Sequence, residues 1–156
     1  MDAIVKECNN VLGNRDMFRG IISSFASKLQ TVPGITLGDN KYCPLKHTFS
    51  NGIYVREIHM PTGTVCVGKI HRHDHPNFIM KGRVTVVTEE GGIEELIAPM
   101  SIISPAGTQR AVYVHEDTIW ITVHHNPDNI TDLEKLEEFI ITTSHTDVLD
   151  VIEMGA

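Results

Sequence analysis

Features that mark several protein classes are missing from this 156-residue sequence. Its three cysteines, Cys8, Cys43 and Cys66, form no Cys-x-x-Cys pair, which argues against a disulfide framework and a thiolate zinc site. No apolar run approaches the roughly 18 to 20 residues of a membrane-spanning helix, and the first residues lack the basic and apolar regions of a signal peptide. We therefore expect a soluble, cytoplasmic protein with reduced, mostly buried cysteines and no membrane partner.

Basic residues are also scarce. The 13 Lys and Arg are outnumbered by 20 Asp and Glu, which gives a formal net charge of −7. General nucleic-acid binders and proteins of anionic membrane surfaces need a basic face, so this balance argues against both. A local basic site for a small anion is still compatible with it. At this length, with 41% hydrophobic and 21% charged residues, the chain is expected to fold as one globular domain.

Residues 1–40 carry a helical pattern and are expected to form an N-terminal helical extension. Apolar residues recur at three- and four-residue spacing after the candidate caps Asn14 and Asp16, and the pattern ends before Pro33. These apolar residues are Phe18, Ile21, Ile22, Phe25 and Leu29. A shorter apolar set over residues 4–12 allows either two short helices or one broken helix.

Residues 41–127 have the pattern of a mainly β domain. Short runs rich in β-branched residues alternate with turn signals at about eight- to twelve-residue spacing, which is typical of an antiparallel sandwich or barrel. The expected strands are residues 53–59, 64–71, 78–80, 83–88, 93–97, 101–104, 110–115 and 118–125. About eight short strands suit a small barrel or jelly roll.

Residues 128–156 are expected to form a C-terminal helix and a tail. Thr131 and Glu134 have the spacing of a capping box, and Leu133, Leu136 and Ile140 supply an apolar stripe. Apolar residues at positions 148, 149, 151 and 152 allow the tail to dock as a short strand or helix, or to contact a partner subunit. The stripes of both helices must be buried on the barrel or between subunits, and we expect a homo-oligomer, a dimer or larger.

Three of the nine histidines, His71, His73 and His75, lie within five residues. In an extended backbone, alternate residues point to one side, with neighbours about 7 Å apart. Neutral imidazoles at such a spacing can share a metal such as zinc, iron, nickel or copper. The alternative is a solvated loop end at which Arg72 and Asp74 neutralise each other.

The segments 69–84 and 105–110 resemble the two motifs of the cupin family. The first motif of that family is Gly, five residues, His-x-His, three or four residues, Glu, six residues and Gly, and the second is Pro-x-Gly-x-x-His. The resemblance implies a cupin-like, double-sheet antiparallel β-barrel, a jelly roll, with α-helices flanking it at both ends of the chain. It also implies a metal or small ligand between the sheets and pairing into dimers.

The first motif can be aligned in two registers. Counting back from Gly82 places His75 at the glutamate position, His71 at the second histidine and Lys69 at the first. The other register needs a two-residue deletion before the turn. In that register His71 and His73 form the His-x-His, and Asn77 stands where the glutamate would be.

The second motif departs from the family at its last position, where Arg110 replaces the histidine. A guanidinium stays protonated and has no lone pair for a metal, but it can clamp a phosphate or carboxylate through two parallel hydrogen bonds. The alternative for Arg110 is an exposed strand position paired with an acid. Two further arginines, Arg56 and Arg83, are expected on solvent-facing strand positions.

A set of short segments spread over residues 43–134 resembles a narrower group, the small cupin-like proteins encoded by tailed bacteriophages. The segments are residues 43–49, 52–58, 71–82, 106–107, 115–120, 123–124 and 131–134. That group keeps a His-three-residues-His pair, which corresponds to His71 and His75, so His73 is an addition. The resemblance implies a fold, a binding site and a host-cytoplasm location, without a single known activity.

Three further residues are candidates on the barrel strands. Alternation places His124, and not His125, on the face of Trp120. The cupin resemblance would bring His124 within reach of His71 and His75, and the alternative is a strand end in water. Trp120 and Tyr113 are candidates for stacking on a planar ligand, with a core position as the alternative.

Two functions of different class follow from these residues. The first is a binding protein without turnover for a small anion, such as a nucleotide-like signalling molecule, held by Arg110, His71, His75, Asn77, Trp120 and Tyr113. The second is a metal-dependent enzyme, an oxygenase, isomerase or hydrolase, with Fe, Zn or Mn held by His71, His75, His73 and His124. A fixed cation beside a metal costs Coulomb energy, so Arg110 favours the first, and no catalytic residue is assigned. A virion or assembly component is a third alternative.

Overall fold

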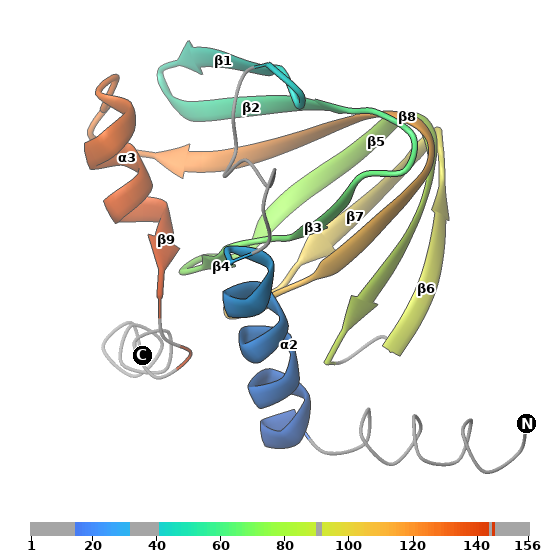
Figure 1. Cartoon of the computed structure of the whole chain (residues 1–156). Coiled ribbons are helices and arrows are strands. Elements are labelled where there is room, and N and C mark those ends of the chain that lie inside the picture. Colours follow the sequence, from blue (N-terminus) through green and yellow to red (C-terminus); the bar gives the residue numbers. More distant parts are fainter. Residues whose placement is uncertain (1–14, 32–40, 90–91, 144, 146–156) are drawn as a thin grey trace, which may run out of the picture.

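The computed structural model describes residues 15–31, 41–89, 92–143 and 145. In that part of the chain, helix α2 (Arg15–Leu29) comes first, nine strands follow, and helix α3 (Leu133–Ile140) lies between the last two strands (Figure 1). The predicted fold class is confirmed: the chain is mainly β, its strands pair antiparallel, one helix precedes the strands and the other lies near the C-terminal end of the sequence. The short apolar set at 4–12 and the expected docking segment at 148–152 lie outside the described residues.

The strands follow the expected turns with three differences. Two long strands each replace a pair of predicted short ones: one covers 78–80 and 83–88, and the other covers 110–115 and 118–125. By contrast, the predicted strand 64–71 is divided into two short strands. Two strands, β1 and β9, were not predicted. The observed strands are β1 (Leu45–Ser50), β2 (Gly52–Met60), β3 (Val65–Val67), β4 (Ile70–His71), β5 (His75–Thr88), β6 (Gly92–Ile97), β7 (Met100–Ser104), β8 (Ala111–Asn126) and β9 (Ile141–Thr142).

The two long strands, β5 and β8, take part in both layers of the barrel. Residues 118–126 of β8 and 75–81 of β5 pair with each other within a layer ordered β1-β2-β8-β5-β7, which we call sheet I. Their other halves lie in a layer ordered β3-β8-β5-β6, which we call sheet II. The pairing register of β5 with β8 shifts between Ile79 and Val84, and this irregularity is where the chain passes from one sheet to the other.

Gly82 allows β5 to bend at this point. Its φ is +88°, a conformation that side-chain-bearing residues rarely adopt. A Cβ at Gly82 would lie 2.5 Å from both the carbonyl oxygen of Asp117 and Oγ1 of Thr118. The two long strands therefore touch backbone to backbone where both change sheets.

The interior between the sheets is apolar at one end and polar at the other. The apolar end is a core cluster of buried side chains with Cys43, Ile58, Cys66, Ala98 and Ile102 packed against it: Met60, Ile79, Val84, Val86, Leu96, Val112, Val114 and Trp120. Further along sheet I the buried residues of the same strands are polar: His75, Asn77, Ser104, Thr122, His124 and Asn126. Neither of the two described cysteines, Cys43 and Cys66, is in a disulfide, and both are partly buried.

Helix α2 buries only part of its predicted apolar stripe. Phe18 and Ile22 are buried on the barrel, whereas Ile21 and Phe25 are exposed, so the barrel covers only part of the apolar face. The helix is fastened through Arg19, whose guanidinium donates hydrogen bonds of 2.6 and 3.0 Å to the Glu89 carboxylate at the end of sheet II. Burial raises the pKa of Glu89, but the bonds from Arg19 and Arg15 outweigh it and hold the pKa below its usual range.

Helix α3 begins one residue later than the capping-box pattern indicated. Its N-cap is Asp132, whose carboxylate accepts hydrogen bonds from the backbone N–H groups of Glu134 and Lys135. Its buried residues Leu136 and Ile140 pack on Tyr54 of sheet I. No helix in the described ranges is both long and apolar enough to cross a membrane.

Candidate functional site

Three histidine rings meet at the polar end of the interior. His71 comes from β4, His75 from the start of β5 and His124 from the end of β8. Their ring centroids lie 4.2 Å apart for His71–His75, 4.9 Å for His75–His124 and 5.2 Å for His71–His124. The structure therefore brings together the three histidines that the cupin resemblance linked.

These imidazoles are held in the neutral form. Burial, reinforced by the neighbouring imidazoles and by Arg56, lowers the pKa of His71 to about 2 and that of His124 to about 3. Burial also lowers the pKa of His75. Near neutral pH each ring therefore has one N–H donor and one nitrogen with a free lone pair.

One ring nitrogen of His75 is buried without a hydrogen-bond partner in the described part of the chain. Its Nδ1 lies 3.2 Å from the carbonyl oxygen of His73, so Nδ1 carries the proton and donates to that oxygen. The other nitrogen, Nε2, is buried and has no hydrogen-bond partner among the described residues. A buried acceptor without a donor is costly, which makes this atom a contact point for a bound group.

Arg110 reaches the same region from the residue just before β8, at the position where the cupin motif has a histidine. Its Nη2 donates a 2.5 Å hydrogen bond to Oγ of the fully buried Ser104, and the guanidinium carbon lies 5.9 Å from the centre of the Trp120 ring. Burial lowers the pKa of Arg110, and the charge of Glu94 partly counters this. The side chain is partly buried, and no described acid forms an ion pair with it.

Asn77 connects the arginine with the core. Its Nδ2 donates to Oγ of Ser104 at 2.6 Å and to the carbonyl oxygen of His75 at 3.1 Å. Its Oδ1 accepts a 2.9 Å hydrogen bond from Nε1 of Trp120. Asn77 and Trp120 therefore position their neighbours, and Trp120 also belongs to the apolar core.

Arg56 lies on the inner face of sheet I, so the expected solvent-facing position was wrong. It is two residues from Tyr54 and four from Met60, so it shares the inner face with these two buried side chains. It also pairs in register with the buried Thr122 of β8. Its charge lowers the pKa of both His71 and His124. Arg83 does face outward, where it forms ion pairs with Glu95 and Glu116.

We call His71, His75, His124, Arg56 and Arg110 the imidazole–guanidinium cluster. Two permanent positive charges border its three neutral rings, and no described acid pairs with either of them. A charge taken out of water without a counter-ion is unfavourable, so the cluster is suited to receive negative charge.

The donor geometry for a metal is incomplete. Neutral imidazoles are good ligands for Fe, Zn or Mn, and the free Nε2 of His75 is available. However, the rings of His71 and His124 stack at 9°, and no group of three or more His, Cys, Asp or Glu among the described residues is placed to hold a metal ion. The arrangement does not fit a metal without rotation of these side chains.

Two predicted site residues, His73 and Tyr113, do not join the three-ring group, although the charge of His73 contributes to lowering the pKa of His124. Residues 72–74 leave the extended conformation, so His73 does not follow His71 and His75, and its ring lies 5.4 Å from that of Phe139 in α3. Tyr113 is 45% exposed between the buried Val112 and Val114, which places it on the outer face of sheet II. That alternation was visible in the sequence and could have excluded Tyr113.

A row of aromatic rings beside the cluster was not predicted. Tyr54 stacks with Phe49 at 5.3 Å, with His47 at 5.9 Å and with His124 at 5.8 Å between ring centroids. Its hydroxyl and Nδ1 of His47 are 2.7 Å apart. The row reaches from the half-exposed Phe49 of β1 to the histidines, so β1 contributes to the site although no strand was expected there.

The C-terminal elements cover one side of the cluster. β9 pairs with β4, so that His71 is opposite Ile141. The backbone N–H and Nε of Arg72 donate to the carbonyl oxygens of Ile140 and Ile141, at 2.8 and 2.9 Å. Lys69 adds an ion pair with Glu137 of α3. Figure 1 shows α3 and β9 at the end of the barrel where β4 lies and where β8 ends.

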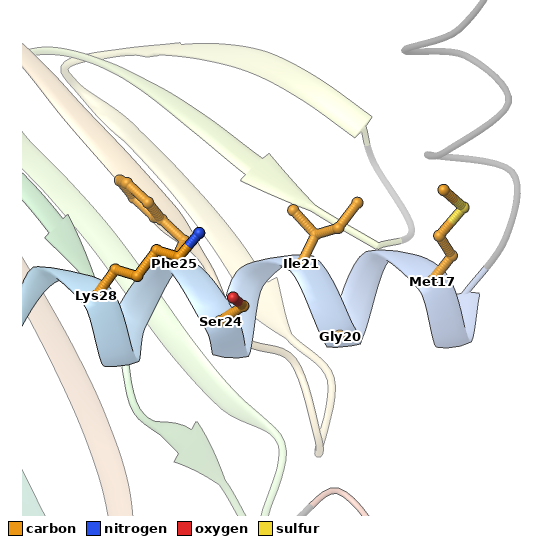
Figure 2. Close-up of a pocket in the computed structure, with 6 residues that line it drawn as sticks. All are labelled: Met17, Gly20, Ile21, Ser24, Phe25 and Lys28. Carbon is orange, nitrogen blue, oxygen red and sulfur yellow. The ribbon is translucent and has the colours of Figure 1, made fainter.

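A separate groove runs along the exposed side of α2 (Figure 2). Met17, Ile21 and Phe25 point the same way along this helix in the figure. The full lining is Met17, Gly20, Ile21, Ser24, Phe25 and Lys28. None of these residues belongs to the imidazole–guanidinium cluster.

No protein-family model matches the sequence, and no curated protein matches it. Solved structures with a similar fold include a protein with a double-stranded β-helix domain from Klebsiella pneumoniae, with 16% identity and a TM-score of 0.49 over 61% of this chain and 86% of that one. KdgF from Halomonas sp. has 18% identity and a TM-score of 0.47 over 56% and 82%. A cupin-2 domain protein from Shewanella frigidimarina has 11% identity and a TM-score of 0.45 over 65% and 92%.

Proposed function

We propose that the chain is a cupin-like binding protein for a small anion with two negative charges, held at the imidazole–guanidinium cluster without turnover. The observation that carries the proposal is the pair Arg56 and Arg110, two guanidinium groups on the inner side of the barrel with no described acid paired to either. A dianion compensates both charges, whereas a monoanion compensates one. The free Nε2 of His75 adds an acceptor for a hydroxyl or N–H group of the ligand.

Phosphate monoesters and dicarboxylates are small anions that carry two negative charges. Arg110 is only partly buried, so its guanidinium is accessible for two parallel hydrogen bonds to such a group. Nucleotide-like phosphates are the members of this class that the resemblance to the bacteriophage group favours. Sequestration of a host signalling nucleotide is a use consistent with binding alone.

The test is calorimetry of the full chain with matched anions, for example AMP against adenosine and malonate against acetate. We expect the dianion of each pair to bind at least tenfold more tightly than its partner. Arg110→Met and Arg56→Met should each remove most of that difference, whereas Arg83→Met, on the outer surface, should leave it unchanged. Equal binding by Arg110→Met and the unaltered chain would overturn the proposal.

A metal-dependent enzyme is the second candidate, favoured by the unpartnered Nε2 of His75 within a set of three touching rings. Metal analysis of untagged protein purified without chelator distinguishes the metal-dependent enzyme from the anion-binding protein. The binding proposal predicts dianion affinity that survives treatment with EDTA. Stoichiometric Fe, Zn or Mn that is lost in both His71→Ala and His75→Ala, together with loss of anion binding in EDTA, supports the enzyme instead.

A further inference from the structure

A single row of inward-facing side chains crosses sheet I at the level of the buried histidines. Phe49 of β1 is opposite Tyr54 of β2, and Tyr54 is opposite His124 of β8. The ring of His124 lies 4.9 Å from that of His75 of β5, which is opposite Ser104 of β7. Side chains directly opposite each other in a sheet share a face, and four of these five are buried. We call the five residues the transverse row.

The two ends of the transverse row differ in their chemistry. At the β7 end, Ser104 accepts the hydrogen bond from the guanidinium of Arg110. At the β1 end, the rings of Phe49 and Tyr54 are stacked, with their planes inclined at 29°. β1 is the first strand in the order of sheet I, so it forms an edge of that sheet. The row therefore leads from a cation inside the barrel to an aromatic ring at its edge.

Phe49 keeps an accessible surface although its neighbours in the row are covered. Its exposed fraction is 38%, whereas those of Tyr54 and His124 are 5% and 6%. Helix α3 covers Tyr54 with Leu136 and Ile140, and among the described residues Phe49 is outside this packed cluster. A phenyl ring that is stacked on one neighbour and open to water elsewhere offers a surface for a further planar group.

Phe49 suits a planar ligand better than the two aromatic residues that the sequence suggested. Trp120 is 6% exposed and belongs to the apolar core, so its faces are already covered by protein. Tyr113 is accessible but lies on the outer face of sheet II. Of these three rings, only that of Phe49 is both accessible and in the same row as the histidines.

The aromatic end of the row is close to the second cation of the imidazole–guanidinium cluster. Arg56 is two residues from Tyr54 on the inner face of β2, a step of about 7 Å along the strand. Burial raises the pKa of Tyr54 and the charge of Arg56 partly counters this, as expected for neighbouring groups. The ring centroids of Phe49 and Tyr54 are 5.3 Å apart. One spacer the size of a pentose can therefore join a ring on Phe49 to an anion at Arg56.

We propose that the transverse row selects dianions that also carry a planar aromatic ring, with the ring stacked on Phe49 and the charged group between Arg56 and Arg110. This inference rests on the proposed function, which supplies the charge of the ligand, and adds the second group that the site recognises. Nucleoside monophosphates and other aryl-bearing phosphates have both groups, whereas malonate and inorganic phosphate have the charge alone. Stacking on an aromatic side chain tolerates different rings, so the presence of a ring matters more than its substituents.

Calorimetry of the full chain with AMP and ribose 5-phosphate tests the inference, because both carry the same phosphate dianion and only AMP carries a base. Stacking of a base on an aromatic side chain is worth about a fivefold or larger change in affinity, so AMP should bind more tightly by at least that factor. Phe49→Leu should abolish the preference for AMP and leave the affinity for ribose 5-phosphate unchanged. Phe49→Trp, which keeps an aromatic face, should retain the preference.

Phe78→Leu is the matched control for the loss of a phenyl ring. Phe78 has nearly the same exposed fraction as Phe49, 37%, but it alternates with the buried Asn77 and Ile79 and so faces outward from sheet I. This variant should bind AMP and ribose 5-phosphate as the unaltered chain does. A loss of the AMP preference in Phe78→Leu equal to that in Phe49→Leu would overturn the assignment of the ring to Phe49.

The same measurements distinguish failure of this inference from failure of the proposed function. Equal binding of AMP and ribose 5-phosphate, or a preference for AMP that persists in Phe49→Leu, overturns the stacking role while binding of the dianion stands. If AMP, ribose 5-phosphate and malonate all fail to bind, the proposed function is wrong and this inference is wrong with it.

Discussion

The Arg110 guanidinium donates a 2.5 Å hydrogen bond to the Ser104 hydroxyl, the same oxygen that accepts a 2.6 Å bond from Asn77. Both oxygen lone pairs of Ser104 are therefore in use, and its own hydrogen is free to donate. This buried hydroxyl fixes the direction of a charged group that has no described acidic partner. One small residue thus links the polar network of sheet I with the cation that we propose binds the anion.

Replacing Ser104 with alanine should weaken both the fold and the site. The change leaves two donors, on Arg110 and Asn77, without that acceptor, and we expect the free energy of unfolding to fall by about 1–3 kcal/mol. Anion affinity should drop several-fold, because the guanidinium loses its orientation. Chemical denaturation and calorimetry measure the two effects. Ser101→Ala, at an exposed position of the same strand, is the control, and equal behaviour of the two variants contradicts the prediction.

Stability should fall as the pH drops from 7.5 to 5. The folded-state pKa values of His71 and His124, about 2 and about 3, lie below the ordinary 6.5, so the unfolded chain takes up protons in this range and the folded chain does not. Each imidazole then costs up to about 1.4 kcal/mol per pH unit below 6.5. Denaturation at several pH values measures the slope, and His71→Asn should reduce it. A flat profile would count against buried neutral rings.

Gly82→Ala should disrupt the barrel. The added Cβ would lie 2.5 Å from the Asp117 carbonyl oxygen, and the φ of +88° would be strained as well. We expect a loss of about 4 kcal/mol or more in the free energy of unfolding, or no folded protein. Gly63→Ala is the matched control: its φ is +83°, but a Cβ there meets nothing within 4 Å, so strain of about 1–2 kcal/mol is expected alone. Thermal unfolding measures the stability loss of both variants. Similar losses in Gly82→Ala and Gly63→Ala would show that the close contact at Gly82 is unimportant.

Glu89→Gln should loosen helix α2. The Glu89 side chain is only 3% exposed and pairs with Arg19 and Arg15. Removing its charge leaves the partly buried Arg19 uncompensated, and we expect a loss of up to about 3 kcal/mol. Glu95→Gln removes a carboxylate from the exposed Arg83 pair and should cost well under about 1 kcal/mol. Denaturant unfolding of both variants measures the loss in the free energy of unfolding. Equal losses for Glu89→Gln and Glu95→Gln would contradict a special role for Glu89.

The sequence predicted the strands well where hydrophobicity and turn residues agreed. Valines on alternate positions and glycines at the turns located most of sheet II. β1 was missed because its inward side chains include His47, which has no apolar character for the alternation to reveal. β9 was missed because two residues are too few to show a period. The joining of predicted strands into β5 and β8 depends on a bend that still preserves pairing, which local turn signals do not distinguish from a loop.

Prediction of the site depended on which face of each strand is polar. His71, His75, His124 and Arg110 were grouped through the cupin resemblance and through alternation from Trp120. Arg56 was assigned to solvent because charged strand residues usually face water, whereas the interior at this end is itself polar. His73 was grouped with its neighbours on the assumption of an unbroken strand, and the backbone turns away at residues 72–74.

The elements that cover the histidines, α3 and β9, follow every residue of the imidazole–guanidinium cluster in the chain. During synthesis the ribosome therefore makes the three histidines and both arginines before it makes the segment that lies across them. A nascent chain ending near Asn126 already holds the complete set of recognition groups, with the β4 edge still lacking its partner. The pairing of His71 with Ile141 therefore has to wait until nearly all of the chain has been made.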